Sequence, residues 1–157
     1  MKTIQKKWLP LFLLATVTFL FPACEGNNPD EDLAGVITIK MLNESNGCTW
    51  INLPGVSCVA ISAANNFVVW QGEHGDLNAG IADVGRRKLS QITTLPYSGW
   101  VHEIAIQLEH CYIYKLENYG YNHENHYLKI YVKDWLKNTS GGIIGAEVKY
   151  CEWNPEQ

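Results

Sequence analysis

The chain has 157 residues, 46% of them hydrophobic and 18% charged, and its formal net charge is −4 at pH 7. This length is enough for one domain with a hydrophobic core and too short for two. An acidic chain is poorly suited to phosphate backbones, and Arg86-Arg87-Lys88 is its only basic cluster, so we expect no nucleic-acid partner.

The N-terminal stretch has the features of an export signal. Three lysines precede an apolar run, residues 8–21, and the sequence Leu20-Phe21-Pro22-Ala23-Cys24 is similar to a bacterial lipobox. The run has 14 residues, whereas a membrane-spanning helix needs about 20. We therefore expect a signal peptide, residues 1–23, that is removed. Cys24 would then carry lipid, including palmitate, and anchor the protein in the outer membrane, where it can face the cell surface.

The segment after the signal predicts a tether followed by one domain. Residues 24–34 combine the lipidated cysteine with an acidic stretch that contains Gly, Pro and two Asn, a composition that buries little apolar surface. Acidic residues at this position also resemble the export signal of Bacteroidetes surface lipoproteins. Residues 35–157 are left as a single β-domain. Loss of the signal removes three lysines and no acidic residue, so the net charge becomes −7.

Four cysteines remain for the domain: Cys48, Cys58, Cys111 and Cys151. An even number in an exported protein favours two disulfides over a metal site, and no CxxC or HxxxH pattern is present. Three pairings are possible, and spacing alone does not choose between them.

Short β-branched and aromatic runs separated by turn residues predict an all-β fold, either a small antiparallel β-sandwich or a partly open barrel. In the first half, Pro54-Gly55 predicts a tight turn, and residues 77–92 are ambiguous but favour extended structure or turns over a helix because of Gly80 and Gly85. The runs expected to form strands here are residues 36–42, 49–53, 56–62 and 67–70.

The second half alternates more clearly, with strands expected at residues 100–108, 111–117, 127–136 and 143–150. In the third of these, Leu128, Ile130, Val132 and Leu136 are predicted on one face, with Tyr127, Lys129, Tyr131, Lys133 and Trp135 on the other. If the last three strands form a meander, Cys111 and Cys151 are expected at opposite ends, which favours bonds from them to Cys48 and Cys58.

Several motifs of the C-terminal half resemble a Bacteroidales outer-membrane lipoprotein family of unknown function. They are residues 96–100, 104–107, 112–115, 127–135 and 139–150, with a looser match at Asn65-Asn66-Phe67. The resemblance implies no catalytic residue. The chain departs from the family at Glu109-His110-Cys111, where glycines are expected beside the histidine.

Two groups of residues are candidates for ligand binding. Tyr127, Tyr131 and Trp135 could form an aromatic platform for sugar rings, which Tyr119, Tyr121 and Trp153 would extend. Cross-strand aromatic pairing or burial within a sandwich explains the same stripe. His123 and His126 could hold haem or a metal ion together with His110 or His102, although two solvated loop histidines are the simpler explanation of the pair.

Catalysis is not expected, because no GxSxG motif or arrangement of serine, histidine and acid is recognisable. Four carboxylates could pair as in a glycosidase, but alternation gives all except Asp134 a solvent-facing position; they are Glu103, Glu109, Asp134 and Glu147. We expect a lipid-anchored, non-catalytic β-domain without a cofactor that binds a glycan or a protein. Histidine-mediated haem or metal capture and a structural envelope or fimbria-associated subunit are the alternatives.

Overall fold

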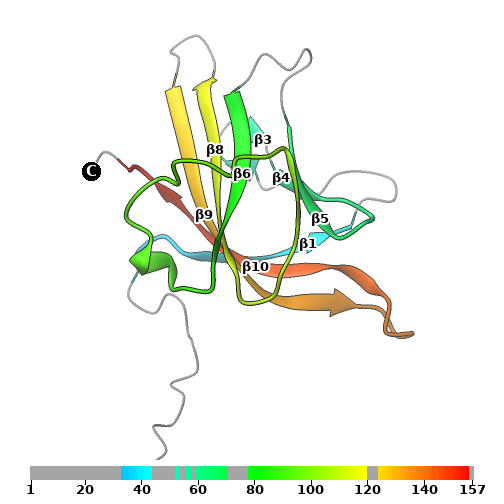
Figure 1. Ribbon diagram of the computed structural model, residues 1–157. Coiled ribbons are helices and arrows are strands. Elements are labelled where there is room, and N and C mark those ends of the chain that lie inside the picture. The colour runs from blue at the N-terminus through cyan, green and yellow to red at the C-terminus, as the bar shows by residue number, and fades with distance from the viewer. Residues whose placement is uncertain are drawn as a thin grey trace, which may run out of the picture.

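The computed structural model describes residues 33–43, 52–53, 56–57, 59–70, 78–119 and 124–155 (Figure 1). These residues form an almost all-β domain in which antiparallel strands make two main sheets. The described strands do not close into a barrel, and the small antiparallel β-sandwich predicted from the sequence is confirmed.

The larger sheet has five strands in the order β1-β10-β9-β8-β6, and every neighbouring pair is antiparallel. Its last three strands in sequence form the predicted meander, and their hairpin β9–β10 projects to one side in Figure 1. The strands are β1 (Ile37–Leu42), β6 (Asn78–Gly85), β8 (Cys111–Tyr119), β9 (Glu124–Lys137) and β10 (Ile143–Trp153).

The smaller sheet has three strands, β4 (Val59–Ile61), β5 (Asn66–Val69) and β7 (Glu103–Ala105), in that order. Two short strands, β2 (Asn52–Leu53) and β3 (Val56–Ser57), pair separately. Two isolated bridges lie beside these sheets: Asn43, just after β1, pairs with Ile61 of β4, and Val101, two residues before β7, pairs with Ile81 of β6.

The ambiguous segment 77–92 contains strand β6 and a short 3-10 helix, η1 (Leu89–Gln91), which agrees with the expectation of extended structure and turns. The strand expected at residues 100–108 is shortened to β7. Just before β7, the backbone at Val101 pairs with Ile81 of the larger sheet instead of continuing the strand in the smaller sheet. The predicted turn at Pro54-Gly55 lies outside the described residues.

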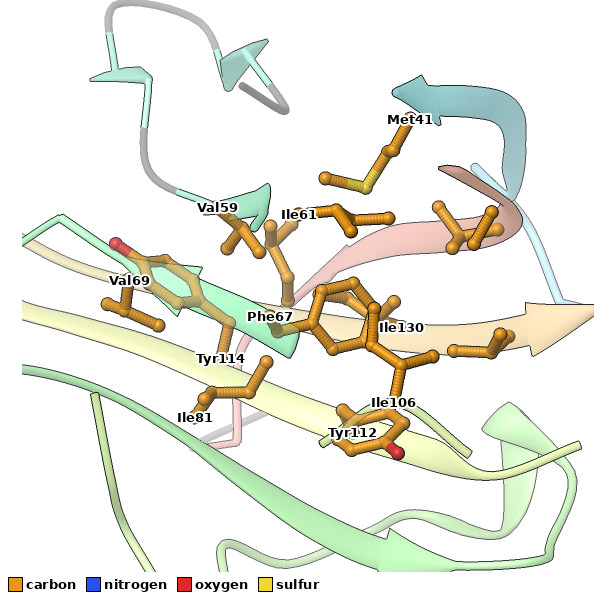
Figure 2. Packing of buried hydrophobic residues seen from close by; sticks show 14 of the residues in the cluster. Met41, Val59, Ile61, Phe67, Val69, Ile81, Ile106, Tyr112, Tyr114 and Ile130 are labelled. Atoms are coloured by element: carbon orange, nitrogen blue, oxygen red, sulfur yellow. The ribbon is translucent and has the colours of Figure 1, made fainter. Parts of the chain in front are cut away.

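The main hydrophobic core fills the space between the two sheets. Phe67 of β5 lies near its centre in Figure 2, and its ring meets the edge of Tyr112 at a centroid distance of 5.1 Å. Aliphatic side chains from both sheets surround this pair; those with no exposed surface include Met41, Val59, Ile61, Ile81, Ile130 and Val148.

A second hydrophobic cluster lies on the other face of the larger sheet, where the segment after β6 folds back over it. Leu89 and Ile92 of this segment are buried against Cys111, Tyr131 and Cys151 of the sheet. The larger sheet is therefore covered on both faces over part of its area. This explains why β8 has four consecutive buried residues, 111–114, rather than simple alternation.

A β-bulge in β9 changes the predicted orientation of the residues that follow it. Val132 pairs with Val148 and Asp134 with Glu147, so Lys133 is an extra residue and the alternation reverses after it. Asp134 is consequently exposed, and the prediction that it faces the core is wrong. By the same reversal, Trp135 packs against the main core instead of sharing a face with Tyr127 and Tyr131.

The two described cysteines do not lie at opposite ends of the meander. Cys111 is opposite Tyr131 on β9, and Cys151 is opposite Lys129, only two residues away. Because β9 lies between β8 and β10, the two cysteines are two strand spacings of about 4.8 Å each apart. This separation exceeds the Cα–Cα distance that a disulfide can bridge. No disulfide joins Cys111 to Cys151, and bonds to Cys48 or Cys58 stay a prediction because those residues lie outside the described structure.

Tyr112 ties the larger sheet to the segment that follows β7. Its hydroxyl donates to the carbonyl of Ala105 at 3.1 Å and accepts from the backbone N–H of Gln107 at 2.8 Å. The side chain is fully buried, and this burial raises the pKa of Tyr112 from 10.0 to about 12.

Alkaline pH is expected to destabilise the protein through Tyr112. Because the pKa is higher in the folded state, the stabilisation is complete below pH 10, the unfolded value, and is lost as pH rises towards 12. The loss amounts to about 2–3 kcal/mol. Urea unfolding of the wild type and Tyr112→Phe between pH 9 and pH 12 should show their stability difference shrinking. A difference that does not change with pH would contradict this role for Tyr112.

Candidate functional site

Four side chains form a transverse row on the outer face of the larger sheet, beside the second cluster. The strand register places Lys115 of β8 opposite Tyr127 of β9, and Tyr127 opposite Trp153 of β10. Trp100 continues the row over Gly80 of β6, which is itself opposite Lys115. We call Trp100, Lys115, Tyr127 and Trp153 the outer aromatic row.

Gly80 allows Trp100 to lie directly on the sheet. A Cβ at Gly80 would be 3.4 Å from the Cβ of Trp100 and 3.5 Å from its ring, so a larger side chain would push the indole outward. Trp100 is also held by its indole N–H, which donates to the carbonyl of Pro96 at 3.1 Å. The Lys115 ammonium lies 5.0 Å from the centre of the Trp100 ring, within the range of a cation–π contact.

The other end of the row pairs two aromatic rings. Tyr127 and Trp153 meet edge to face, with centroids 6.4 Å apart and planes at 66°. The ammonium of Lys129 lies 4.5 Å from the centre of the Trp153 ring, and Lys129 is only 5% exposed. These contacts fix the orientation of Trp153 close to the end of the last strand.

A single carboxylate, Glu117, connects the polar atoms of the row. It accepts a hydrogen bond from the Tyr127 hydroxyl at 3.1 Å, and it forms an ion pair with Lys115 at 3.1 Å. It also accepts a hydrogen bond from the amide of Asn78. The Lys115 and Glu117 side chains are 15% and 22% exposed, so the network is shielded but in contact with solvent.

The arrangement provides ring faces and edges next to fixed donors and acceptors. Tyr and Trp offer large, stiff contact areas with a polar group at one end, and the neighbouring lysines and Glu117 supply hydrogen bonds. All four members of the row are partly exposed. Such a surface is suited to a ligand that has both apolar ring faces and hydroxyl groups.

The aromatic platform predicted from the sequence is only partly brought together. Tyr127 belongs to the row, whereas Tyr131 is 6% exposed within the second cluster and Trp135 lies on the other face. Trp153, predicted to extend the platform, is confirmed as the neighbour of Tyr127. Tyr121 lies outside the described residues.

Sequence reasoning missed Trp100 and Lys115. Trp100 begins the strand expected at residues 100–108, but the observed strand β7 starts only at Glu103, so the alternation did not indicate that Trp100 lies over β6. Lys115 could have been found by pairing β8 with β9, because the register puts it directly beside Tyr127.

The candidate histidines lie on different elements. His102 is exposed next to β7, His126 lies on β9, and His123 is outside the described residues. His110 donates from Nδ1 to the carboxylate of Asp83, whose two oxygens lie 2.9 and 3.0 Å away. Within the described part of the chain, no three His, Cys, Asp or Glu side chains gather as a metal site would require.

Each of the four candidate carboxylates forms a hydrogen bond or an ion pair. Glu103 accepts from Asn66 at 2.8 Å, and Glu109 pairs with Arg86 at 3.5 Å. Asp134 and Glu147 are cross-strand partners, and Glu147 forms an ion pair with Lys133 at 2.6 Å. Asp134 accepts from the backbone N–H of Trp135 at 2.7 Å.

Among the described residues, no helix is long and apolar enough to cross a membrane. A comparison with curated proteins finds no match. Residues 38–157, which include all ten described strands except the first residue of β1, match a family described only as a domain of unknown function. The resemblance to a family of unknown function is thereby confirmed, and the chain belongs to the DUF5036 family.

Proposed function

We propose that this protein is a lipid-anchored envelope protein of a Bacteroidales bacterium whose β-domain binds a glycan or a protein partner without catalysis. The observation that carries the binding proposal is the outer aromatic row. Two ring systems, Trp100 and the Tyr127–Trp153 pair, flank Lys115 on one sheet face. A glycan is the preferred partner, because sugar rings present apolar C–H faces and hydroxyls together.

The membrane part of the proposal is supported by the sequence alone. The basic start, the apolar run of residues 8–21 and the lipobox-like end at Cys24 form a consistent export and lipidation signal. The acidic tether that follows would let the domain move within roughly 15 Å of the membrane, from about 5–6 Å multiplied by the square root of its length. A surface-displayed domain of this kind would meet extracellular glycans directly.

A glycan array probed with residues 25–157 tests the proposal. We expect selective binding by the wild type and a loss of at least about tenfold with Trp153→Ala, which is about 1.4 kcal/mol. Trp70→Ala is the matched control, because Trp70 is 36% exposed directly after β5 of the smaller sheet, and its replacement should leave binding unchanged. Tyr127→Phe keeps the ring and removes the hydrogen bond to Glu117, so a smaller loss is expected.

Thermal unfolding of each variant shows whether it is folded before its binding is compared. A folded wild type that binds no glycan on the array would remove the glycan version of the proposal. Equal losses for Trp153→Ala and Trp70→Ala would place the binding surface elsewhere.

A further inference from the structure

A cavity of about 550 Å³ lies between the end of β6 and the segment that folds back over the larger sheet. This volume falls within the range of small-molecule sites, about 300–1,000 Å³. It is separate from the outer aromatic row, although the same segment holds Trp100 through Pro96. Its lining includes Asp83, Arg87, Ile92, Thr93, Thr94 and Leu95.

One side of the cavity contains a fixed carboxylate, Asp83. Its Oδ1 accepts from the backbone N–H of Gly85 at 2.7 Å, and His110 contacts both of its oxygens. Gly85 has φ of +78°, which glycine adopts without strain and which turns its N–H back towards Asp83. A carboxylate has about four acceptor positions, so Asp83 keeps capacity for a ligand hydroxyl, and its side chain is 22% exposed.

The remaining lining adds a cation and two hydroxyls. Arg87 is exposed, and within the described part of the chain no ion pair to it is found, whereas its neighbour Arg86 pairs with Glu109. Thr93 and Thr94 are exposed residues that supply hydroxyl groups. Ile92, which is 2% exposed, and Leu95 add apolar side chains to the lining.

We infer that this cavity binds a sugar unit that bears a carboxylate, such as a uronic acid. Arg87 would pair with the ligand carboxylate, since guanidinium groups bind carboxylates through two parallel hydrogen bonds. Asp83 and the threonine hydroxyls would bind the ring hydroxyls, and Ile92 and Leu95 would contact the apolar face of the ring. The inference goes beyond the proposed function, because this site can bind whether or not the outer aromatic row does.

The test is an NMR titration of the full-length, ¹⁵N-labelled chain with D-glucuronate and, separately, with D-glucose, at constant ionic strength. D-Glucuronate should shift the amide signals of Gly85, Gln91, Thr93 and Thr94, and the shifts should saturate. The expected dissociation constant is in the millimolar range, which corresponds to about 4 kcal/mol of binding free energy. D-Glucose, which lacks the carboxylate, should bind at least about tenfold more weakly.

Variants test whether sugar binding depends on residues that line the cavity. Arg87→Gln should weaken D-glucuronate binding at least about tenfold, while Arg86→Gln, the matched control, should change it less than about twofold. Thr94→Val removes one hydroxyl without touching the Asp83–His110 contact and should weaken both sugars. An amide spectrum like that of the wild type shows that each variant is folded.

Each of four results would overturn the inference. One is the absence of saturable shifts at these amides up to about 50 mM sugar. Another is equal binding of D-glucose and D-glucuronate, and the third is equal binding by the wild type and Arg87→Gln. Shifts confined to the indole signals of Trp100 and Trp153 would also overturn it, while supporting the proposed function.

Discussion

Replacing Gly145 with alanine is expected to lower the free energy of unfolding by about 3 kcal/mol or to prevent folding. Gly145 lies opposite Leu42, where β1 joins β10. A Cβ there would be 2.0 Å from the carbonyl oxygen of Met41 and 2.9 Å from the Cα of Leu42. Both are backbone atoms, so β1 itself would have to move, and the buried Met41 would leave its place in the core.

Gly141→Ala is the matched control for this prediction. Gly141 lies in the turn between β9 and β10 with φ of +84°, and nothing is within 4 Å of an added Cβ. Alanine should therefore cost only the left-handed backbone penalty of about 1–2 kcal/mol. Urea unfolding of both variants measures the difference. Equal destabilisation by the two substitutions would show that the close approach of β1 and β10 is not a determinant of stability.

The substitution Cys24→Ser is expected to abolish lipid attachment completely. A serine cannot form the thioether to diacylglycerol, and each acyl CH₂ that inserts into the membrane contributes about 0.8 kcal/mol to binding. One chain binds a membrane only marginally, whereas two or more anchor it stably. In cells fed labelled palmitate, the wild type should be labelled and should partition into detergent, and the variant should do neither.

Detection of the variant protein in the same cells serves as the control for that result. The same variant should still be detected by immunoblotting, so that loss of label is not loss of protein. If Cys24→Ser is labelled and partitions like the wild type, the anchor is at another position and the proposed localisation is wrong.

The sequence predicted the last three strands well because hydrophobic alternation decides which side of a strand faces the core. Leu128, Ile130 and Val132 are fully buried, as their spacing predicts. The prediction failed after Lys133, since a bulge adds one residue and reverses the faces of Asp134 and Trp135. No residue type in β9 marks this bulge, because it depends on pairing with β10.

The candidate site was harder to predict because it is assembled across strands. Tyr127 and Trp153 are 26 positions apart, and only the register of β9 with β10 makes them neighbours. Trp100 reaches the same face through a segment whose only regular element is η1. The cavity beside Asp83 likewise depends on how this segment folds back, which tertiary packing of Leu89 and Ile92 determines.

The central claim is that the outer aromatic row is a ligand-binding surface. The most direct measurement follows the indole N–H signals of the ¹⁵N-labelled domain while a glycan that binds on the array is added. The signals of Trp100 and Trp153 should shift with saturation, while those of Trp70, directly after β5, and Trp135, packed against the main core, should stay unchanged. Saturable shifts of Trp70 or Trp135 with no change at Trp100 and Trp153 would contradict the claim.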